Sequence, residues 1–188
     1  MLVVSNHTSW ADALLIGAVL PGTFVARADL VDWPAIGWAA RVMSVIRINR
    51  ASLRELPGVV AAVAQRLRDG RTVVAFPEGT TFCGSDHGRF RPALFQAAID
   101  ASRPVQPLHL SYRHHDGTPS TVAAFLGEDS LWASLKRVSR TQVTMVQIFV
   151  LPLQLPAACR RELALRCESA VRGALRQPAD LRIDAAAA

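Results

Sequence analysis

A histidine and an aspartate lie five residues apart near the start of the chain, in the segment NHTSWAD of residues 6–12. An apolar run precedes this segment and a helical pattern follows it, so we expect His7 just before a helix and Asp12 in its first turn. With Ser9 as the N-cap, the backbone can fold back and bring the Asp12 carboxylate to the His7 ring. Such a contact fixes the imidazole tautomer, which favours His7 as a general base. A capping box in which Asp12 only closes the helix start gives the same pattern.

A second polar segment, FPEGTT of residues 76–81, follows another apolar run. Proline and glycine hold such a loop open and leave backbone amides exposed. Those amides, together with the threonine hydroxyls, can hold a substrate oxygen or the oxyanion of a tetrahedral intermediate. The same residues are also ordinary turn formers, so this segment alone does not decide between the two interpretations.

Elements that position both segments can be predicted from hydrophobic periodicity. Apolar runs predict strands over residues 2–4, 23–26, 45–48, 72–76, 105–110, 122–126 and 143–151. Helical spacing and helix start and stop residues predict helices over residues 11–19, 57–67, 92–101, 131–138 and 157–175. This alternation predicts a single α/β domain over residues 1–178, with a mostly parallel or mixed sheet flanked by helices, followed by a fraying tail over 179–188.

The two segments together resemble the phosphate and glycerol acyltransferase family, in particular the 1-acylglycerol-3-phosphate acyltransferases. The family's N-H-x-x-x-x-D motif matches at His7 and Asp12, and its F-P-E-G-T motif matches at residues 76–80. The resemblance implies the glycerol-3-phosphate acyltransferase-like form of the α/β fold. It also implies that His7 and Asp12 are catalytic and that Glu78, Gly79 and Thr80 bind the acceptor.

Two further family motifs have weaker counterparts. VIRINR at residues 45–50 is similar to the family's phosphate-binding motif, with Asn49 in place of the usual Asp, and this implies that Arg50 binds phosphate. VQPLHL at residues 105–110 is similar to the fourth motif. Many members have Arg where Thr81 stands; Arg89 and Arg91 are candidates to replace that anion contact, or are solvated loop charges.

Composition limits the partners of the chain. Only 19% of residues are charged and 51% are hydrophobic, which excludes a disordered chain. The net charge of +6 comes from 20 Arg and one Lys and favours an anionic partner, for which we expect a membrane surface. The arginines are scattered, without an RNA-binding motif or a DNA-reading helix, so we expect no nucleic acid partner.

Cysteines and targeting signals bear on the compartment. Cys83, Cys159 and Cys167 form no C-x-x-C pair, so we expect neither a disulfide framework nor a metal site. We find no signal peptide and no apolar run of the roughly 18 residues that a spanning helix needs. We therefore expect a cytoplasmic domain that is peripheral to the inner face of the cell membrane, with Trp33, Ile36 and Trp38 as lipid-docking candidates or core residues.

The resemblance implies transfer of a fatty acyl group to the free hydroxyl of lysophosphatidic acid or a related lysolipid. The donor is an acyl thioester of coenzyme A or of acyl carrier protein, and no cofactor is expected. Lyso-ornithine lipid is an alternative acceptor, and a non-catalytic lipid-binding module is an alternative function. A serine hydrolase is disfavoured because the sequence has no G-x-S-x-G elbow.

Overall fold

A computed structural model describes residues 1–27, 45–49, 52, 54–83, 87–127, 129–141, 144–174 and 182–186 of the chain. The side chains of Arg27 and of residues 182–186 are not described. Four residues singled out from the sequence lie outside the described ones: Arg50, Trp33, Ile36 and Trp38.

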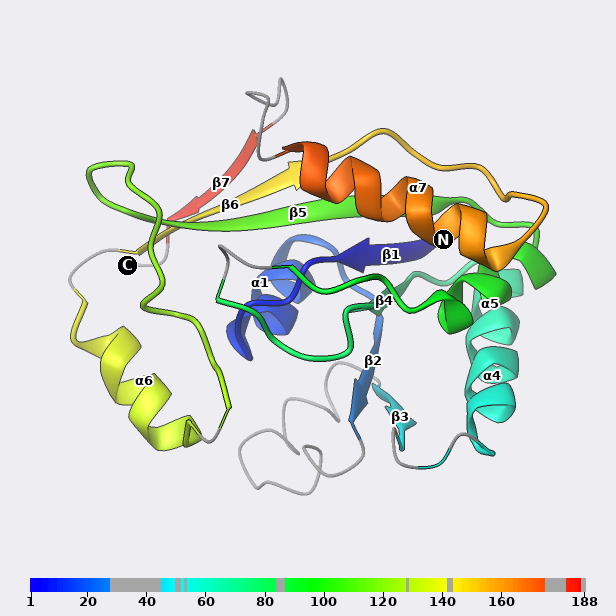
Figure 1. Ribbon diagram of the computed structural model, residues 1–188, viewed down its shortest axis with the longest axis horizontal. Helices are drawn as coiled ribbons and strands as arrows, with labels where there is room; N and C mark the ends of the chain where they lie inside the picture. Colours follow the sequence, from blue (N-terminus) through cyan, green and yellow to red (C-terminus); the bar gives the residue numbers. More distant parts are fainter. Residues whose placement is uncertain are drawn as a thin grey trace.

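Seven described strands form one mixed sheet in the order β3-β2-β4-β1-β5-β6-β7 (Figure 1). They are β1 (Leu2–Ser5), β2 (Thr23–Arg27), β3 (Val45–Ile48), β4 (Val73–Ala75), β5 (Val105–His114), β6 (Thr144–Val150) and β7 (Arg182–Ala186). The strands from β3 to β5 run parallel, whereas β6 is antiparallel to β5 and β7 is antiparallel to β6. The predicted α/β class with a mixed sheet is therefore confirmed.

Helices cover both faces of this sheet, and alternate residues of each strand pack on opposite sides. Leu2 and Val4 of β1 point into one core with helices α4 (Leu56–Arg68), α5 (Phe95–Asp100) and α7 (Arg160–Gly173). Val3 points into a second core with helix α1 (Ala11–Val19). The short 3₁₀ helix η1 (Pro92–Leu94) leads into α5, and helix α6 (Leu131–Ser139) adds Val138 to the second core.

The structure corrects the predicted strand over residues 122–126, which form turns and irregular backbone. The side chain of Arg137, on α6, donates to the carbonyls of Val122 and Ala124 at 2.8 and 2.6 Å. A strand needs such carbonyls for a neighbouring strand, so these bonds compete with sheet formation. The apolar run here is short, and periodicity alone could not tell a strand from a segment that a side chain pins down.

The expected fraying tail is also corrected in part, because Arg182–Ala186 form β7 and pair with Met145–Phe149 of β6. Alanine has a low strand propensity, so nothing in this segment predicts a strand. The unpaired edge of β6 supplies the hydrogen-bonding groups that the tail uses.

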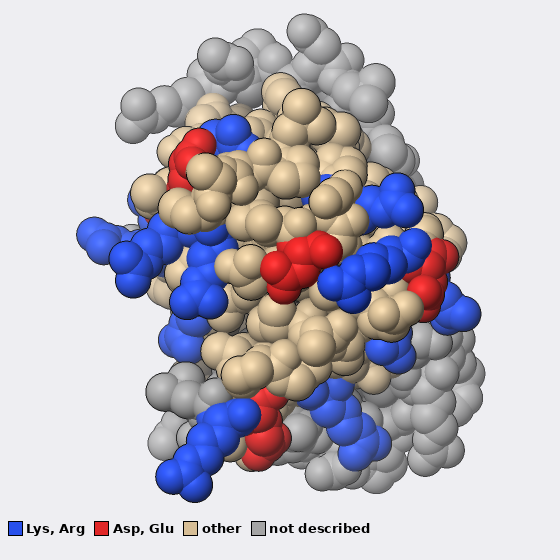
Figure 2. Space-filling view, turned by 90° about the vertical axis from the view of Figure 1, so that its right-hand side faces the viewer, with Lys and Arg blue, Asp and Glu red and all other residues tan. Residues whose placement is uncertain are grey.

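Charged side chains are dispersed over the face that Figure 2 shows, the side of the molecule where α4 and α5 lie in Figure 1. Basic side chains, drawn in blue, are interspersed there with acidic and uncharged ones and do not form a continuous stripe. This distribution differs from the clustered basic surface that a nucleic-acid-binding domain usually presents.

Candidate active site

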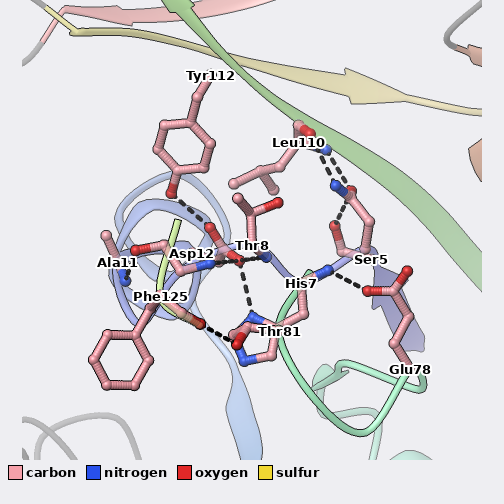
Figure 3. Close-up of polar contacts among 12 residues, drawn as sticks. Ser5, His7, Thr8, Ala11, Asp12, Glu78, Thr81, Leu110, Tyr112 and Phe125 are labelled. Atoms are coloured by element: carbon pink, nitrogen blue, oxygen red, sulfur yellow. Dashed lines mark hydrogen bonds and ion pairs between the residues drawn. The ribbon is translucent and has the colours of Figure 1, made fainter. Parts of the chain in front are cut away.

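The two polar segments meet because the strands before them are parallel neighbours. Val4 of β1 is in register with Ala75 of β4, so the loops that follow both strands leave the sheet at the same edge. In open α/β sheets this carboxyl edge is where ligands bind. The backbone N–H of His7 donates to Glu78 Oε2 at 2.8 Å, which joins the two loops directly (Figure 3). The histidine segment and the FPEGT loop therefore lie together at this edge of the sheet.

His7 is oriented by a buried carboxylate. Its Nδ1 lies 2.9 Å from Asp12 Oδ2, and the Asp12 side chain is 0% exposed whereas that of His7 is 19% exposed. The same carboxylate oxygen accepts from the backbone N–H groups of Thr8 and Ser9 at 2.6 and 2.9 Å. This oxygen faces His7 Nδ1 as an acceptor, so the tautomer with the proton on Nδ1 is the one that donates to Asp12. Nε2 is then the ring nitrogen that can take a proton from a substrate.

The start of α1 differs slightly from the prediction. Trp10, rather than Ser9, occupies the N-cap position, and no side-chain cap hydrogen bond is formed there. Ser9 Oγ instead accepts from the backbone N–H of Ala11 at 3.3 Å. The Asp12 carboxylate does close the helix start through Thr8 and Ser9, as a capping box does, while also holding His7. The Asp12 carboxylate therefore both closes the helix start and contacts the His7 ring, and the role of His7 as a general base stays a prediction.

Tyr112 is a residue of this network that the sequence did not indicate. Its hydroxyl donates to Asp12 Oδ1 at 2.5 Å, and its side chain is buried in the second core beside Leu110 (Figure 3). Burial, the Asp12 charge and the hydrogen bond to Asp12 raise the pKa of Tyr112 well above its usual range, so it stays a donor. Leu108, Leu110 and Tyr112 follow the strand period of two, so extending the predicted strand beyond residue 110 would have placed Tyr112 on this face.

Asn6 connects the histidine loop to β5. Its Oδ1 accepts from the Leu110 N–H at 2.8 Å and its Nδ2 donates to the Leu110 carbonyl at 2.9 Å. The side-chain amide thus makes the two hydrogen bonds that another strand residue would make through its backbone. This explains structurally why the histidine motif of this chain begins with an asparagine.

Glu78 connects the loop that carries His7 to the segment around Gly88. Its carboxylate is only 4% exposed and accepts from the N–H groups of His7 at 2.8 Å and of Gly88 at 3.2 Å. Burial raises the pKa of Glu78 to about 7, although the two amides lower it in part. These bonds make Glu78 a positioning residue for the histidine loop; its predicted contact with the acceptor stays a prediction.

An open cleft lies near His7, which does not line it but contacts one of its lining residues, Phe76. The ring of Phe76 stacks on the His7 ring, with centroids 4.2 Å apart and an interplanar angle of 16°. Phe76 also lines the cleft, which extends past Gly79 and Arg91 to Asn49 after β3. Its other lining residues are mostly apolar: Val25, Ile48, Ser52, Leu56, Pro77, Ala93 and Leu94. The cleft can therefore take a partly apolar ligand next to the histidine.

Of the two predicted anion-binding arginines that the structure describes, Arg89 and Arg91, only Arg91 lines the cleft. Its backbone N–H donates to the Pro77 carbonyl at 2.9 Å, and its guanidinium lies over Gly79. Gly79 has a φ of +81°, and a Cβ at this position would lie 2.9 Å from Arg91 Nε. Thr80 and Arg89 are exposed and are not among the residues that line the cleft.

The segment around Phe125 forms a further brace of the site. The Phe125 N–H donates to the Thr8 carbonyl at 3.0 Å, and the Thr81 hydroxyl donates to the Phe125 carbonyl. Both contacts connect residues more than 40 positions apart. Nothing in the local sequence around Phe125 predicts them.

The described residues contain no group of three or more His, Cys, Asp or Glu side chains that could hold a metal ion. No helix in the described part of the chain is long and apolar enough to cross a membrane.

The fold and the site place a histidine, oriented by a buried carboxylate, at the carboxyl edge of an α/β sheet, the arrangement of an enzyme that uses histidine as a base. Residues 1–111 match the family model described as Acyltransferase. A lyso-ornithine lipid O-acyltransferase from Pseudomonas aeruginosa is 39% identical over 176 residues, which cover 93% of this chain and 67% of that protein. A 1-acyl-sn-glycerol-3-phosphate acyltransferase from Neisseria gonorrhoeae is 37% identical over 123 residues, covering 65% of this chain and 48% of that protein.

The chain therefore belongs to the acyltransferase family, and the resemblance inferred from the motifs is confirmed. The crystal structure of a 1-acyl-sn-glycerophosphate acyltransferase from Thermotoga maritima has the same fold, with a TM-score of 0.62 at 24% identity over 94% of this chain and 65% of that one. The chain spans between about half and two thirds of the length of these three proteins.

Proposed function

We propose that the protein transfers a fatty acyl group from a thioester to the free hydroxyl of a lysolipid. The observation that carries this proposal is the His7 and Asp12 pair, which lies beside a largely apolar cleft at the carboxyl edge of the sheet. Family membership supports the reaction type, and the lysolipid acceptors in the relatives' names support the substrate class.

The proposed reaction is a direct transfer. His7 Nε2 takes the proton of the acceptor hydroxyl while that oxygen attacks the thioester carbonyl carbon. The tetrahedral intermediate then collapses, the carbon–sulfur bond breaks, and the His7 imidazolium returns the proton to the leaving thiolate. Asp12 keeps its charge and stabilises the imidazolium throughout. The products are an ester and a free thiol, and no acyl-enzyme is formed.

Acceptor binding is assigned to the cleft between His7 and the end of β3. Arg91 lines this cleft, and Arg50 directly follows Asn49, which lines it too. We propose that these two arginines bind the acceptor head group, because guanidinium groups match phosphate oxygens well. The Gly79 N–H donates to the Phe76 carbonyl at 3.2 Å. We therefore assign the oxyanion to the amides of Thr80 and Thr81 instead.

The names of the relatives give two candidate acceptors with different head groups, lysophosphatidic acid and lyso-ornithine lipid. The relative that matches 93% of this chain is named for lyso-ornithine lipid, whereas the 1-acylglycerol-3-phosphate enzyme matches 65% of it. Asn49 and Thr81 also depart from the phosphate-acceptor motifs. We propose lyso-ornithine lipid as the second candidate acceptor beside lysophosphatidic acid.

The donor and the compartment belong to the same proposal. Thioesters of coenzyme A and of acyl carrier protein are both candidate donors, and we place the domain in the cytoplasm at the inner face of the membrane.

The test combines each donor with each acceptor and follows two products. Purified protein is incubated with acyl-coenzyme A or acyl carrier protein thioester, and free thiol and acylated lipid are measured together. A transferase yields equal amounts of both, a hydrolase yields thiol without acylated lipid, and a lipid-binding module yields neither. Arg50→Ala and Arg91→Ala should raise the KM for a phosphate acceptor by about 10- to 100-fold each, as expected for one charge-assisted contact. An unchanged KM would reject the head-group role of that arginine.

A further inference from the structure

Helix α6 presents large apolar side chains to solvent. Trp132 is 74% exposed and Leu135 is 42% exposed, and Leu126, which precedes the helix, is also 42% exposed. Tryptophan is usually well buried in soluble domains, and its amphipathic ring is enriched where proteins meet lipid head groups. The outer surface of α6 therefore differs from a face that is adapted only to water.

Basic side chains stand next to these apolar ones. At 100° per residue, Leu135, Trp132, Lys136 and Arg140 follow one another around the helix axis, and all four are exposed. Arg137 points the other way, where it binds Asp129 at 2.6 Å and the carbonyls before the helix. The described acidic residue near α6, Asp129, thus forms its ion pair with Arg137 and not with Lys136 or Arg140. Within the part of the chain that the structure describes, the outward face combines an apolar strip with basic side chains, Lys136 and Arg140, that form no ion pair.

The helix is tied to the catalytic loop by two routes. The indole N–H of Trp10, in the histidine motif, donates to Ser134 Oγ of α6 at 3.1 Å. Arg137 of α6 holds the Ala124 carbonyl, and the next residue, Phe125, donates to the Thr8 carbonyl. Figure 1 shows α6 on the opposite side of the molecule from α4 and α5. A surface that α6 contacts is therefore coupled to the loop that carries His7.

We propose that α6 docks the domain on an anionic phospholipid bilayer. Trp132 and Leu135 enter the boundary between head groups and acyl chains, and Lys136 and Arg140 lie at the level of the lipid phosphates. The helix lies in the plane of the interface and does not cross it. Docking through α6 brings the histidine loop to the layer in which a lysolipid resides. This last consequence depends on the proposed function, whereas the binding itself does not.

The binding test uses vesicles of phosphatidylethanolamine and phosphatidylglycerol with the His7→Ala chain, so that no chemistry can alter the lipid. Trp132→Ser with Leu135→Ser should lower the partition coefficient on the order of tenfold or more, because both apolar side chains lose their burial in lipid. Lys136→Glu and Arg140→Glu should each lower it by about fivefold or more, and added salt should weaken wild-type binding. Matched controls are Leu165→Ser, at an apolar position that is 61% exposed on α7, and Arg161→Glu, an exposed arginine on the same helix.

Several results would overturn the proposal. One is a wild-type chain that does not bind these vesicles, and another is binding that the α6 variants keep or that the α7 controls lose equally. Binding that is the same on phosphatidylcholine vesicles rejects the charge component. In chains with His7 intact, activity on a monomeric short-chain acceptor should change by less than about twofold in the α6 variants. Loss of that activity would place α6 in the active site instead, whereas vesicle binding without any acyl transfer would reject the proposed function alone.

Discussion

Glu78→Gln is the substitution that best tests how the site is held together. The carboxylate of Glu78 is buried, and its pKa is raised from 4.5 to about 7, first of all by that burial. Between these two pH values the folded protein keeps a proton that the unfolded chain has lost. Because the folded state binds more protons, the free energy of unfolding falls as pH rises from 4.5 to about 7. A shift of this size corresponds to about 2 to 3 kcal/mol over the whole window.

Glutamine is nearly isosteric with protonated glutamate but does not titrate. Its amide can accept from only one of the His7 and Gly88 N–H groups, which costs about 1 to 3 kcal/mol at every pH. The informative quantity is therefore how steeply the free energy of unfolding changes with pH. Relative to the wild type, Glu78→Gln should gain about 2 to 3 kcal/mol of unfolding free energy between pH 4.5 and 8.

Urea unfolding at a series of pH values measures this difference. Glu162→Gln on α7 is the matched control, because Glu162 is 52% exposed and its removal should leave the wild-type slope unchanged. If the wild-type and Glu78→Gln curves run parallel across the window, Glu78 is not the titrating group and the account of its burial is wrong.

Three further substitutions test the chemistry of the site. His7→Ala should lower turnover by about 100- to 10,000-fold with the acceptor KM largely kept, and unchanged turnover in the coupled thiol and product assay would refute the role of His7 as base. Tyr112→Phe should lower the unfolding free energy by about 1.5 to 3 kcal/mol, because Asp12 loses a buried donor, and should lower kcat more than it raises KM; an unchanged urea midpoint would contradict this. Gly79→Ala strains a φ of +81° and forces Arg91 away, so the acceptor KM should rise and the melting temperature should fall, whereas an acceptor KM equal to the wild type's would show that the Arg91 position does not matter.

The sequence allowed most of the fold and the central pair of the site to be predicted. Strong apolar runs mark β1 and β4, and their polar successors fall at the same edge of a parallel sheet, whereas the pairing of β1 with β4, which makes His7 and the FPEGT loop neighbours, is seen only in the structure. The cap-like spacing of Ser9 and Asp12 predicted the turn that brings the carboxylate to the ring. These features depend on local patterns and on one general rule about parallel strands.

Features that depend on distant contacts could not be predicted in this way. Tyr112 lies 100 residues from Asp12, and its role becomes visible only when β5 is known to continue past Leu110. The segment of residues 122–126 is apolar enough for a strand, but its backbone groups bond instead to distant residues, namely Arg137, Thr8 and Thr81. Strand β7 likewise depends on a partner strand rather than on its own residues.

The Tyr112 hydroxyl also bears on what counts as the smallest working unit of this enzyme. The match to the family model ends at residue 111, one position before the tyrosine whose hydroxyl donates to Asp12 Oδ1. A fragment trimmed to the matched region would lose this donor and the β6 neighbour of β5. The antiparallel extension thus supplies a residue of the His7 and Asp12 network, and engineered chimeras should exchange it together with the motifs.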